Sequence, residues 1–383
     1  MLYHKSAEVS EALRYSIKDK FVVDLTATGT PAPVDTSINS STTKKTWFAG
    51  LNSIRFILAF IVVLSHCPNP IQVFLRDSSI GVVRYLGMFM AVSYVGVAAV
   101  IAFFIISGFV IHYPNKAGIR DIKKFYTKRV VRILIPLLTI QLIGMRFGNP
   151  ERDVVWSLYC ELIYYAIYPL LVRIRLTWHT KLLLSFAVAS VIIFLVSKND
   201  ILSMLTQSDR HYSGEIWQFG IGYTWLIGLP YWLLGVNLAE RIDSLNQQIT
   251  TKKIWLLRSS MFFASVLCCV LRFHSFVPYG VSMLVIAVPM VKWLEAEILY
   301  YKTQRPVQIL EKFGNFSYSL YLCHPLLIAI LLPILPISNS SYLVYLFVCV
   351  VGAYVFYSLL EKPAHMIAEK ISNNFLSAKV KNI

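Results

Sequence analysis

The chain has 383 residues, of which 56% are hydrophobic and only 15% are charged, against about 25% charged residues in soluble domains. Together with a mean hydropathy of +0.60, this composition excludes a soluble globular enzyme and a largely disordered chain. The formal net charge of +16 is better explained by basic cytoplasmic loops of a polytopic membrane protein than by nucleic-acid binding, so we expect no nucleic-acid partner.

The first 46 residues contain no apolar run of membrane-spanning length. Residues 1–24 carry one helical stripe of apolar side chains, and residues 25–46 are rich in Thr, Ser and Pro, which is typical of a flexible linker. We therefore predict a cytoplasmic N-terminal extension with a linker over 1–46, a transmembrane domain over 47–365 and a cytoplasmic tail over 366–383.

Apolar segments are spread over the rest of the chain. Because a helical span needs about 20 apolar residues, the sequence predicts an all-α integral membrane protein, a bundle of about ten transmembrane helices. The stretch 71–90 is either an interfacial helix or an early start to the second span. The predicted spans are 47–67, 91–112, 130–147, 156–173, 181–197, 219–240, 254–274, 277–294, 315–335 and 342–361.

The distribution of basic residues predicts the topology. With the N-terminus inside, 28 lysines and arginines fall in cytoplasmic segments and 7 in external ones. Since cytoplasmic loops carry the excess of Lys and Arg, we expect both termini in the cytoplasm.

Ionisable residues inside the spans are informative, because a central Arg or Asp costs about 2.5–3.5 kcal/mol to insert. Arg55 and His66 lie three helical turns apart in the first span, on one face and roughly 16 Å apart along the axis. Glu161 lies in the fourth span at a depth close to that of His66. Its carboxylate either pairs with His66 as a general-base arrangement or makes a structural hydrogen bond to a neighbouring helix.

Other polar positions point to the interior of the bundle. Arg129 and Arg132 share one helix face where the third span enters from the cytoplasm. Ser107 and Gly108, at mid-depth or below in the second span, allow close helix approach. The ninth span is polar and aromatic, so it either lines a cavity or packs inside the bundle; its notable residues are Ser317, Tyr318, Ser319, Tyr321 and His324.

These residues predict two groups, with Arg55, Arg129 and Arg132 near the cytoplasmic rim and His66 and Glu161 near the outer rim. The separation suits a long, thin ligand with an anionic head, because guanidinium binds phosphate in a bidentate way. The sequence has no Walker motif, no glycine-rich dinucleotide motif and no metal-ligand cluster. We therefore expect no metal and no permanently bound cofactor.

Six motifs stand in a particular order along the chain: Arg55-x10-His66, FFIISGFVI at 103–111, FYTKRVVRILIP at 125–136, WSLYCELIYYAIYP at 156–169, FSYSLYLCHP at 316–325, and the closing Glu361-Lys362-Pro363. In this order they make the sequence resemble the acyltransferase-3 family of membrane-bound acyltransferases. Residues 1–46 and most of spans five to eight lie outside the resemblance.

The resemblance implies an inner-membrane enzyme that moves an acetyl or other short acyl group from cytoplasmic acetyl-coenzyme A to a hydroxyl of a cell-surface or exported glycan, such as O-antigen, capsule or exopolysaccharide. By the same resemblance Arg55, Arg129 and Arg132 contact the coenzyme, His66 is catalytic, and Glu161 supports His66 or the acceptor. It leaves open whether His66 is a general base or carries the acyl group. Candidate cavity or acceptor residues are Ser157, Ser317, Tyr318, Ser319 and His324, and among them Ser157, Tyr318 or Ser319 would donate to the oxyanion.

Two other functions fit part of the pattern. An exporter or flippase of a glycan or acylated metabolite explains the spans and the buried charges, but not an arginine cluster at coenzyme-arm distance from a His–Glu pair. An acyltransferase with a lipid, peptide or antibiotic-precursor acceptor fits equally well. The expected partners are acetyl-coenzyme A, a glycan or lipid-linked glycan acceptor and membrane lipids, and the expected location is the bacterial inner membrane.

Overall fold

The computed structural model describes residues 48–199, 202, 206, 219–275 and 277–380. The chain from Trp47 onward forms one compact unit, and in its described part all regular structure is helical. The extension and linker predicted over 1–46 lie outside the described residues.

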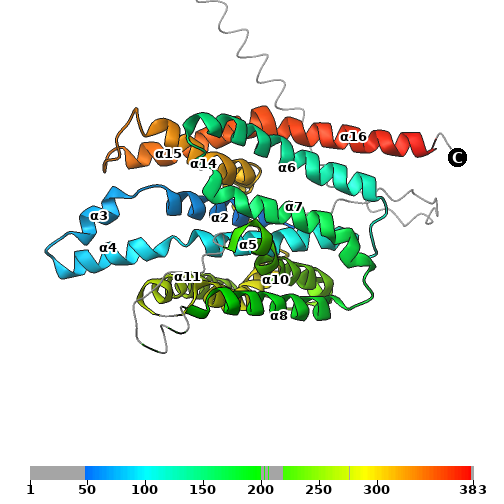
Figure 1. Cartoon of the computed structure of the whole chain (residues 1–383), viewed down its shortest axis with the longest axis horizontal. Coiled ribbons are helices and arrows are strands. Elements are labelled where there is room, and N and C mark those ends of the chain that lie inside the picture. The colour runs from blue at the N-terminus through cyan, green and yellow to red at the C-terminus, as the bar shows by residue number, and fades with distance from the viewer. Residues whose placement is uncertain (1–47, 200–201, 203–205, 207–218, 276, 381–383) are drawn as a thin grey trace, which may run out of the picture. The chain divides into compact units, whose positions relative to one another are not determined.

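Most of the helices follow one another with short connections (Figure 1). Short 3-10 turns follow α5 (η1, Tyr113–Asn115), α6 (η2, Met145–Phe147) and α10 (η4, Ile242–Ser244), and a π-helical turn (η5, Tyr357–Glu361) joins α15 to α16. The α-helices are α2 Leu51–His66, α3 Pro70–Arg76, α4 Gly81–Ser93, α5 Gly96–His112, α6 Ile122–Gly144, α7 Arg152–Arg173, α8 Trp178–Val196, α10 Gly220–Arg241, α11 Thr251–His274, α12 Tyr279–Tyr300, α13 Gln308–Gly314, α14 Ser317–Leu331, α15 Tyr342–Phe356 and α16 Lys362–Val380.

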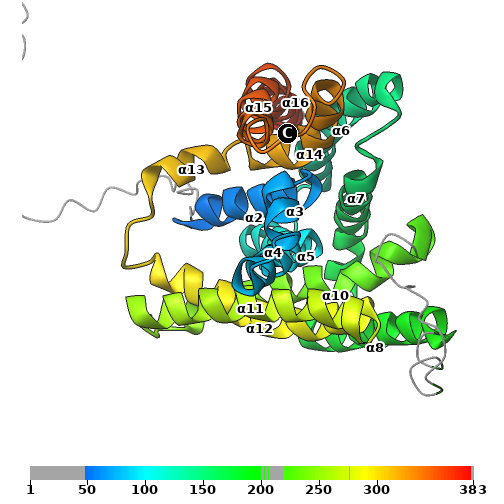
Figure 2. The same cartoon turned by 90° about the vertical axis from the view of Figure 1, so that its left-hand side faces the viewer.

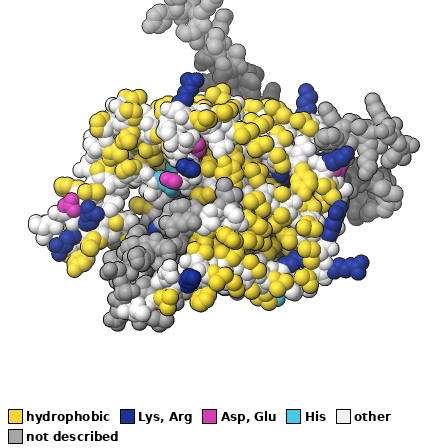
Figure 3. All heavy atoms as spheres, viewed as in Figure 1, with side chains coloured by type: hydrophobic (Ala, Val, Ile, Leu, Met, Phe, Trp, Pro, Cys, Tyr) yellow, Lys and Arg dark blue, Asp and Glu magenta, His cyan; other side chains and the backbone are white. Residues whose placement is uncertain are grey.

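Each of the ten predicted spans falls on a helix, so the all-helical fold class is confirmed. Among the described residues, six helical segments are long and apolar enough to cross a membrane, and counting two bent helix pairs as spans raises this number to eight. Figure 3 shows the corresponding surface, with apolar side chains over most of one face and Lys and Arg mainly toward its two ends. The chain is thus a multi-spanning helical membrane protein, while ten spans and cytoplasmic termini stay predictions.

The segment between the first two predicted spans forms its own hairpin. The stretch 71–90 divides into α3 and the start of α4, which pack on each other. At the same time Gly81–Asn115 qualifies as one apolar segment of 35 residues. Helix α4 is therefore the early start of the second predicted span, and α3 is a separate short helix bent by 61° from α2.

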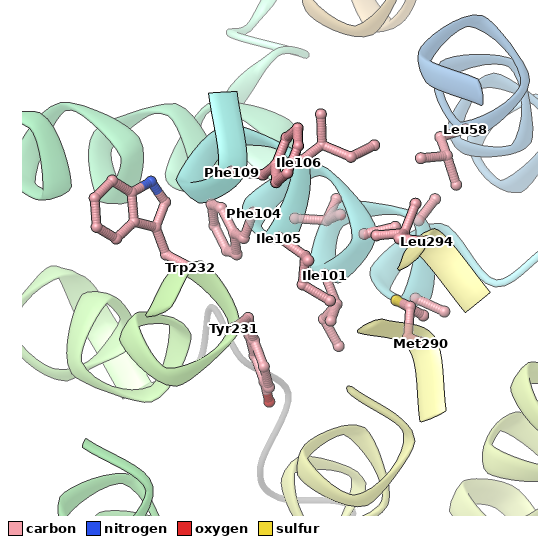
Figure 4. Close-up of a cluster of buried hydrophobic side chains, with 14 of the residues drawn as sticks. Leu58, Ile101, Phe104, Ile105, Ile106, Phe109, Tyr231, Trp232, Met290 and Leu294 are labelled. Carbon is pink, nitrogen blue, oxygen red and sulfur yellow. The ribbon is translucent and has the colours of Figure 1, made fainter. Parts of the chain in front are cut away.

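Helix α5 forms the centre of the bundle, because nearly every side chain along it is buried. It packs against α2, α7, α10 and α12, and Figure 4 shows its residues Ile101, Ile105 and Phe109 in the core near Tyr231 and Trp232 of α10. The small residue predicted to allow close approach does so, since a Cβ added to Gly108 would lie 1.9 Å from the Trp232 carbonyl oxygen. Figure 2 shows α8, α11 and α12 on the α10 side of this centre and α14, α15 and α16 on the α2 side.

A sharp bend of 67° between α13 and α14 turns the chain just before the ninth predicted span. Helix α13 is held on α2 by the Glu311 carboxylate, which accepts hydrogen bonds from the Ser53 amide at 2.9 Å and the Ser53 hydroxyl at 2.7 Å. The Asn52 amide donates to Asn315 at 3.2 Å. These contacts set where the polar first turns of α14 meet α2.

Candidate active site

A cavity of about 120 Å³ lies among α2, α5, α6, α7, α14 and the π turn. Its polar lining combines arginines, carboxylates and hydroxyl groups. Seven of the ten candidate catalytic, coenzyme-binding and acceptor residues line it, namely Arg55, Arg129, Arg132, Ser157, Glu161, Ser317 and Tyr318.

The three arginines come from two helices and meet at this cavity. Arg55 interacts electrostatically with Arg132 and Arg129, and the Arg129 guanidinium lies 6.0 Å from the ring centres of both Phe125 and Tyr165. Within the described part of the chain, none of the three guanidinium groups forms a hydrogen bond or an ion pair. Since three half-buried guanidinium groups gathered in one cavity favour a negatively charged partner, they make the cavity a site for an anion.

Glu161 lies with the arginines and not with His66. Its Oε1 accepts a hydrogen bond from the Ser107 hydroxyl at 2.6 Å and another from the Tyr165 hydroxyl. The Trp232 indole in turn donates to the Ser107 oxygen at 3.3 Å. Among the described residues Glu161 makes no hydrogen bond to His66, and the second interpretation, a hydrogen bond to a neighbouring helix, is the one the structure shows.

The start of α7 accounts for part of the difference from the prediction. The fourth span was predicted to begin near Trp156, whereas α7 begins at Arg152. This places Glu161 roughly 13 Å along the helix, about 6 Å deeper than expected, and it lines the same cavity as the arginines. The carboxylate consequently serves the anion cavity as a counter-charge.

His66 and His324 form a pair of neighbouring rings outside the lining of the cavity. His66 is the last residue of α2 and is exposed, and its ring centre lies 5.1 Å from that of fully buried His324 on α14. Among the described residues that line the cavity neither histidine appears, but Tyr321 does, and its ring centre lies 6.4 Å from that of His324. The histidine pair therefore lies next to the cavity, beyond Tyr321 along α14.

Two further predicted positions differ in the structure. Ser319 does not line the cavity, because it points to the opposite side of α14 from Ser317 and donates to the Glu361 carboxylate at 2.6 Å. Tyr318 lines the cavity, but its hydroxyl donates to the Ile133 carbonyl at 3.1 Å. The Ser157 hydroxyl lies 2.7 Å from that of Tyr321, so all three oxyanion candidates have partners in this state.

Sequence reasoning missed several cavity residues. Glu361 was interpreted as a cytoplasmic helix end with a possible ion pair; it is 1% exposed and lines the cavity from the π turn, a distortion frequent at functional sites. Ser107 was assigned only to helix packing. Tyr165 had a signal, because it follows Glu161 by four residues and so shares its helix face.

The fold and the cavity define a multi-pass helical membrane protein with a buried cationic site; its described residues contain no metal-binding cluster of His, Cys, Asp or Glu. A family model described as an acyltransferase domain matches residues 48–149 and 154–358. The chain therefore belongs to the acyltransferase-3 family and is a membrane acyltransferase. No curated protein and no solved structure matches it.

Proposed function

We propose that the protein is an O-acyltransferase of the bacterial inner membrane that moves an acetyl group from cytoplasmic acetyl-coenzyme A to a hydroxyl of a cell-surface or exported glycan. The observation that carries the proposal is the cavity with three guanidinium groups that have no hydrogen bond or ion pair among the described residues. In a membrane acyltransferase, the anion that such a site accepts is best supplied by the phosphates of the acyl donor.

Charge supports the donor assignment. Arg55, Arg129 and Arg132 face two carboxylates in the cavity lining, Glu161 and Glu361. One positive charge is left over, and bidentate hydrogen bonds from guanidinium to phosphate provide the geometry. A neutral transported sugar would not require this surplus.

The reacting end of the donor would lie toward His66. The first span separates Arg55 from His66 by roughly 16 Å, a span suited to the extended arm between the coenzyme phosphates and its thioester. The Nδ1 atom of His66 lies 2.9 Å from the Val62 carbonyl, and because a carbonyl only accepts, Nδ1 donates its hydrogen there. The exposed ring then has a basic Nε2, which takes the proton of the acceptor hydroxyl as the C–O bond forms and the C–S bond breaks.

The test uses membranes that contain equal amounts of wild type, His66→Ala or His179→Ala, supplied with radiolabelled acetyl-coenzyme A. We expect wild type and His179→Ala, which removes an exposed histidine of α8, to release free thiol and to label a base-labile glycan fraction. We expect His66→Ala to do neither. Thiol release without glycan label would indicate a lipid or peptide acceptor, and a wild type that produces neither product would favour the exporter.

A further inference from the structure

The imidazole rings of His66 and His324 lie next to each other but differ in their exposure to solvent. The ring planes are inclined at 55° and the centres are 5.1 Å apart. His66 is exposed at the end of α2, whereas His324 has no exposed surface on α14. A substrate can therefore reach His66 directly but can meet His324 only through it.

Both rings have the same hydrogen placement. Nδ1 of His66 lies 2.9 Å from the Val62 carbonyl oxygen, and Nδ1 of His324 lies 3.1 Å from that of Leu320. Since a carbonyl oxygen only accepts, each Nδ1 carries the hydrogen and each Nε2 keeps its lone pair. The Nε2 atom of His324 is buried and has no hydrogen-bond partner in the described structure, although buried polar atoms are nearly always paired.

We infer that His324 is a positioning residue whose Nε2 accepts a hydrogen bond from the Nε2–H that forms when His66 takes the proton of the acceptor hydroxyl. The inference rests on the proposed function. While both rings are neutral the two Nε2 atoms are both acceptors, so no bond can join them; one proton on His66 supplies the missing donor. His66 shares this N–H between the acceptor oxygen and His324 as a three-centre bond.

The rings are close enough for this role. An N–H···N bond of about 2.9 Å would place two imidazole centres roughly 5 Å apart; the centres lie 5.1 Å apart, while His324 Nε2 has no hydrogen-bond partner in the described structure. In the step itself the hydroxyl O–H bond breaks, the proton rests on His66, the ester C–O bond forms, and the departing thiolate finally takes the proton. His324 stays neutral throughout and stabilises the cationic His66, the task first assigned to Glu161.

If His324 only packed against His66, any aromatic ring of similar size could replace it. The variants therefore test the ring and its acceptor nitrogen separately. His324→Phe keeps an aromatic ring against His66 but has no acceptor atom. His324→Ala leaves a ring-sized space that added imidazole or pyrrole can enter, and only imidazole brings an acceptor nitrogen. Cys323→Ala is the matched control, because Cys323 is the neighbouring residue and is 2% exposed.

Each variant is measured in membranes for thiol release from acetyl-coenzyme A, with its amount and thermal stability checked. We expect His324→Phe to lower kcat about 10- to 100-fold, the worth of a hydrogen bond to a charged group, with KM for acetyl-coenzyme A unchanged. Imidazole should restore His324→Ala while pyrrole does not, and Cys323→Ala should match wild type.

A full kcat in His324→Phe, or equal rescue by pyrrole and imidazole, overturns this inference and leaves the proposed function intact. If His324→Phe fails to accumulate, the comparison of imidazole with pyrrole in His324→Ala decides alone. A wild type that releases no thiol overturns the proposed function and the role of His324 with it.

Discussion

A close backbone approach in the core predicts a large effect of a single methyl group. Gly108 of α5 faces α10, and a Cβ at this position would lie 1.9 Å from the carbonyl oxygen of Trp232 and 2.9 Å from its carbonyl carbon. Ordinary contact requires about 3.5 Å. The obstacle is backbone, so no side-chain rotation relieves it, and Gly108→Ala must push the two helices apart.

The magnitude follows from the kind of contact. Overpacking a core costs typically about 1–3 kcal/mol, and a clash between two helix backbones belongs at the upper end, about 3 kcal/mol. The same displacement would move Ser107, whose hydroxyl binds Glu161 at 2.6 Å. We therefore expect Gly108→Ala to lower both the free energy of unfolding and the acyltransferase activity.

The assay is thermal unfolding of the detergent-solubilised protein, followed by its loss of solubility, beside acetyl transfer in membranes. Gly222→Ala is the matched control, since it lies on α10 with no atom within 4 Å of the added Cβ. Alanine there should be neutral or stabilise by up to about 1 kcal/mol through helix propensity. A Gly108→Ala protein with wild-type melting temperature would refute the reasoning.

Three further predictions concern charge. Arg132→Gln should raise KM for acetyl-coenzyme A about 10- to 100-fold, the range of a charge-assisted hydrogen bond, with kcat little changed; an unchanged KM in steady-state kinetics would remove Arg132 from the donor site. Glu161→Gln should reduce thermal stability by about 1–3 kcal/mol, because the cavity then holds three guanidinium groups against one carboxylate, and added coenzyme A should recover part of the loss; equal melting of both proteins would contradict this. Lys116 donates to the Asp243 carboxylate at 2.6 Å and lowers the pKa of that carboxyl below its usual value. The pair therefore stabilises the fold above about pH 4, and this stabilisation is lost as the pH falls through the lowered pKa. Asp243→Asn should cost less than about 1 kcal/mol at pH 7 and nothing in more acidic buffer, and a gap that persists in acid-pH melting curves would show that the ion pair is not its source.

The sequence by itself determined which segments are helical and which charges lie among them. Apolar runs of spanning length can satisfy their backbone groups in a membrane only as helices, so each of the ten predicted segments coincides with a helix. The cost of a buried charge likewise singled out Arg55 in its span and Glu161 in another. Both facts depend on local sequence alone, and both survive in the structure.

Only the tertiary structure decided which of these residues meet. Depth depends in part on the residue at which a helix begins, and α7 begins four residues before the predicted span, while Glu161 bonds to Ser107 and lines the cavity together with the arginines. The contacts that a side chain makes depend on the helix packed against it. Ser319 donates to Glu361, and the ring of His324 lies next to that of His66. Neither the π turn that brings Glu361 to the cavity nor the bend before α14 has a local hydropathy signal, because packing between helices distant in sequence stabilises both.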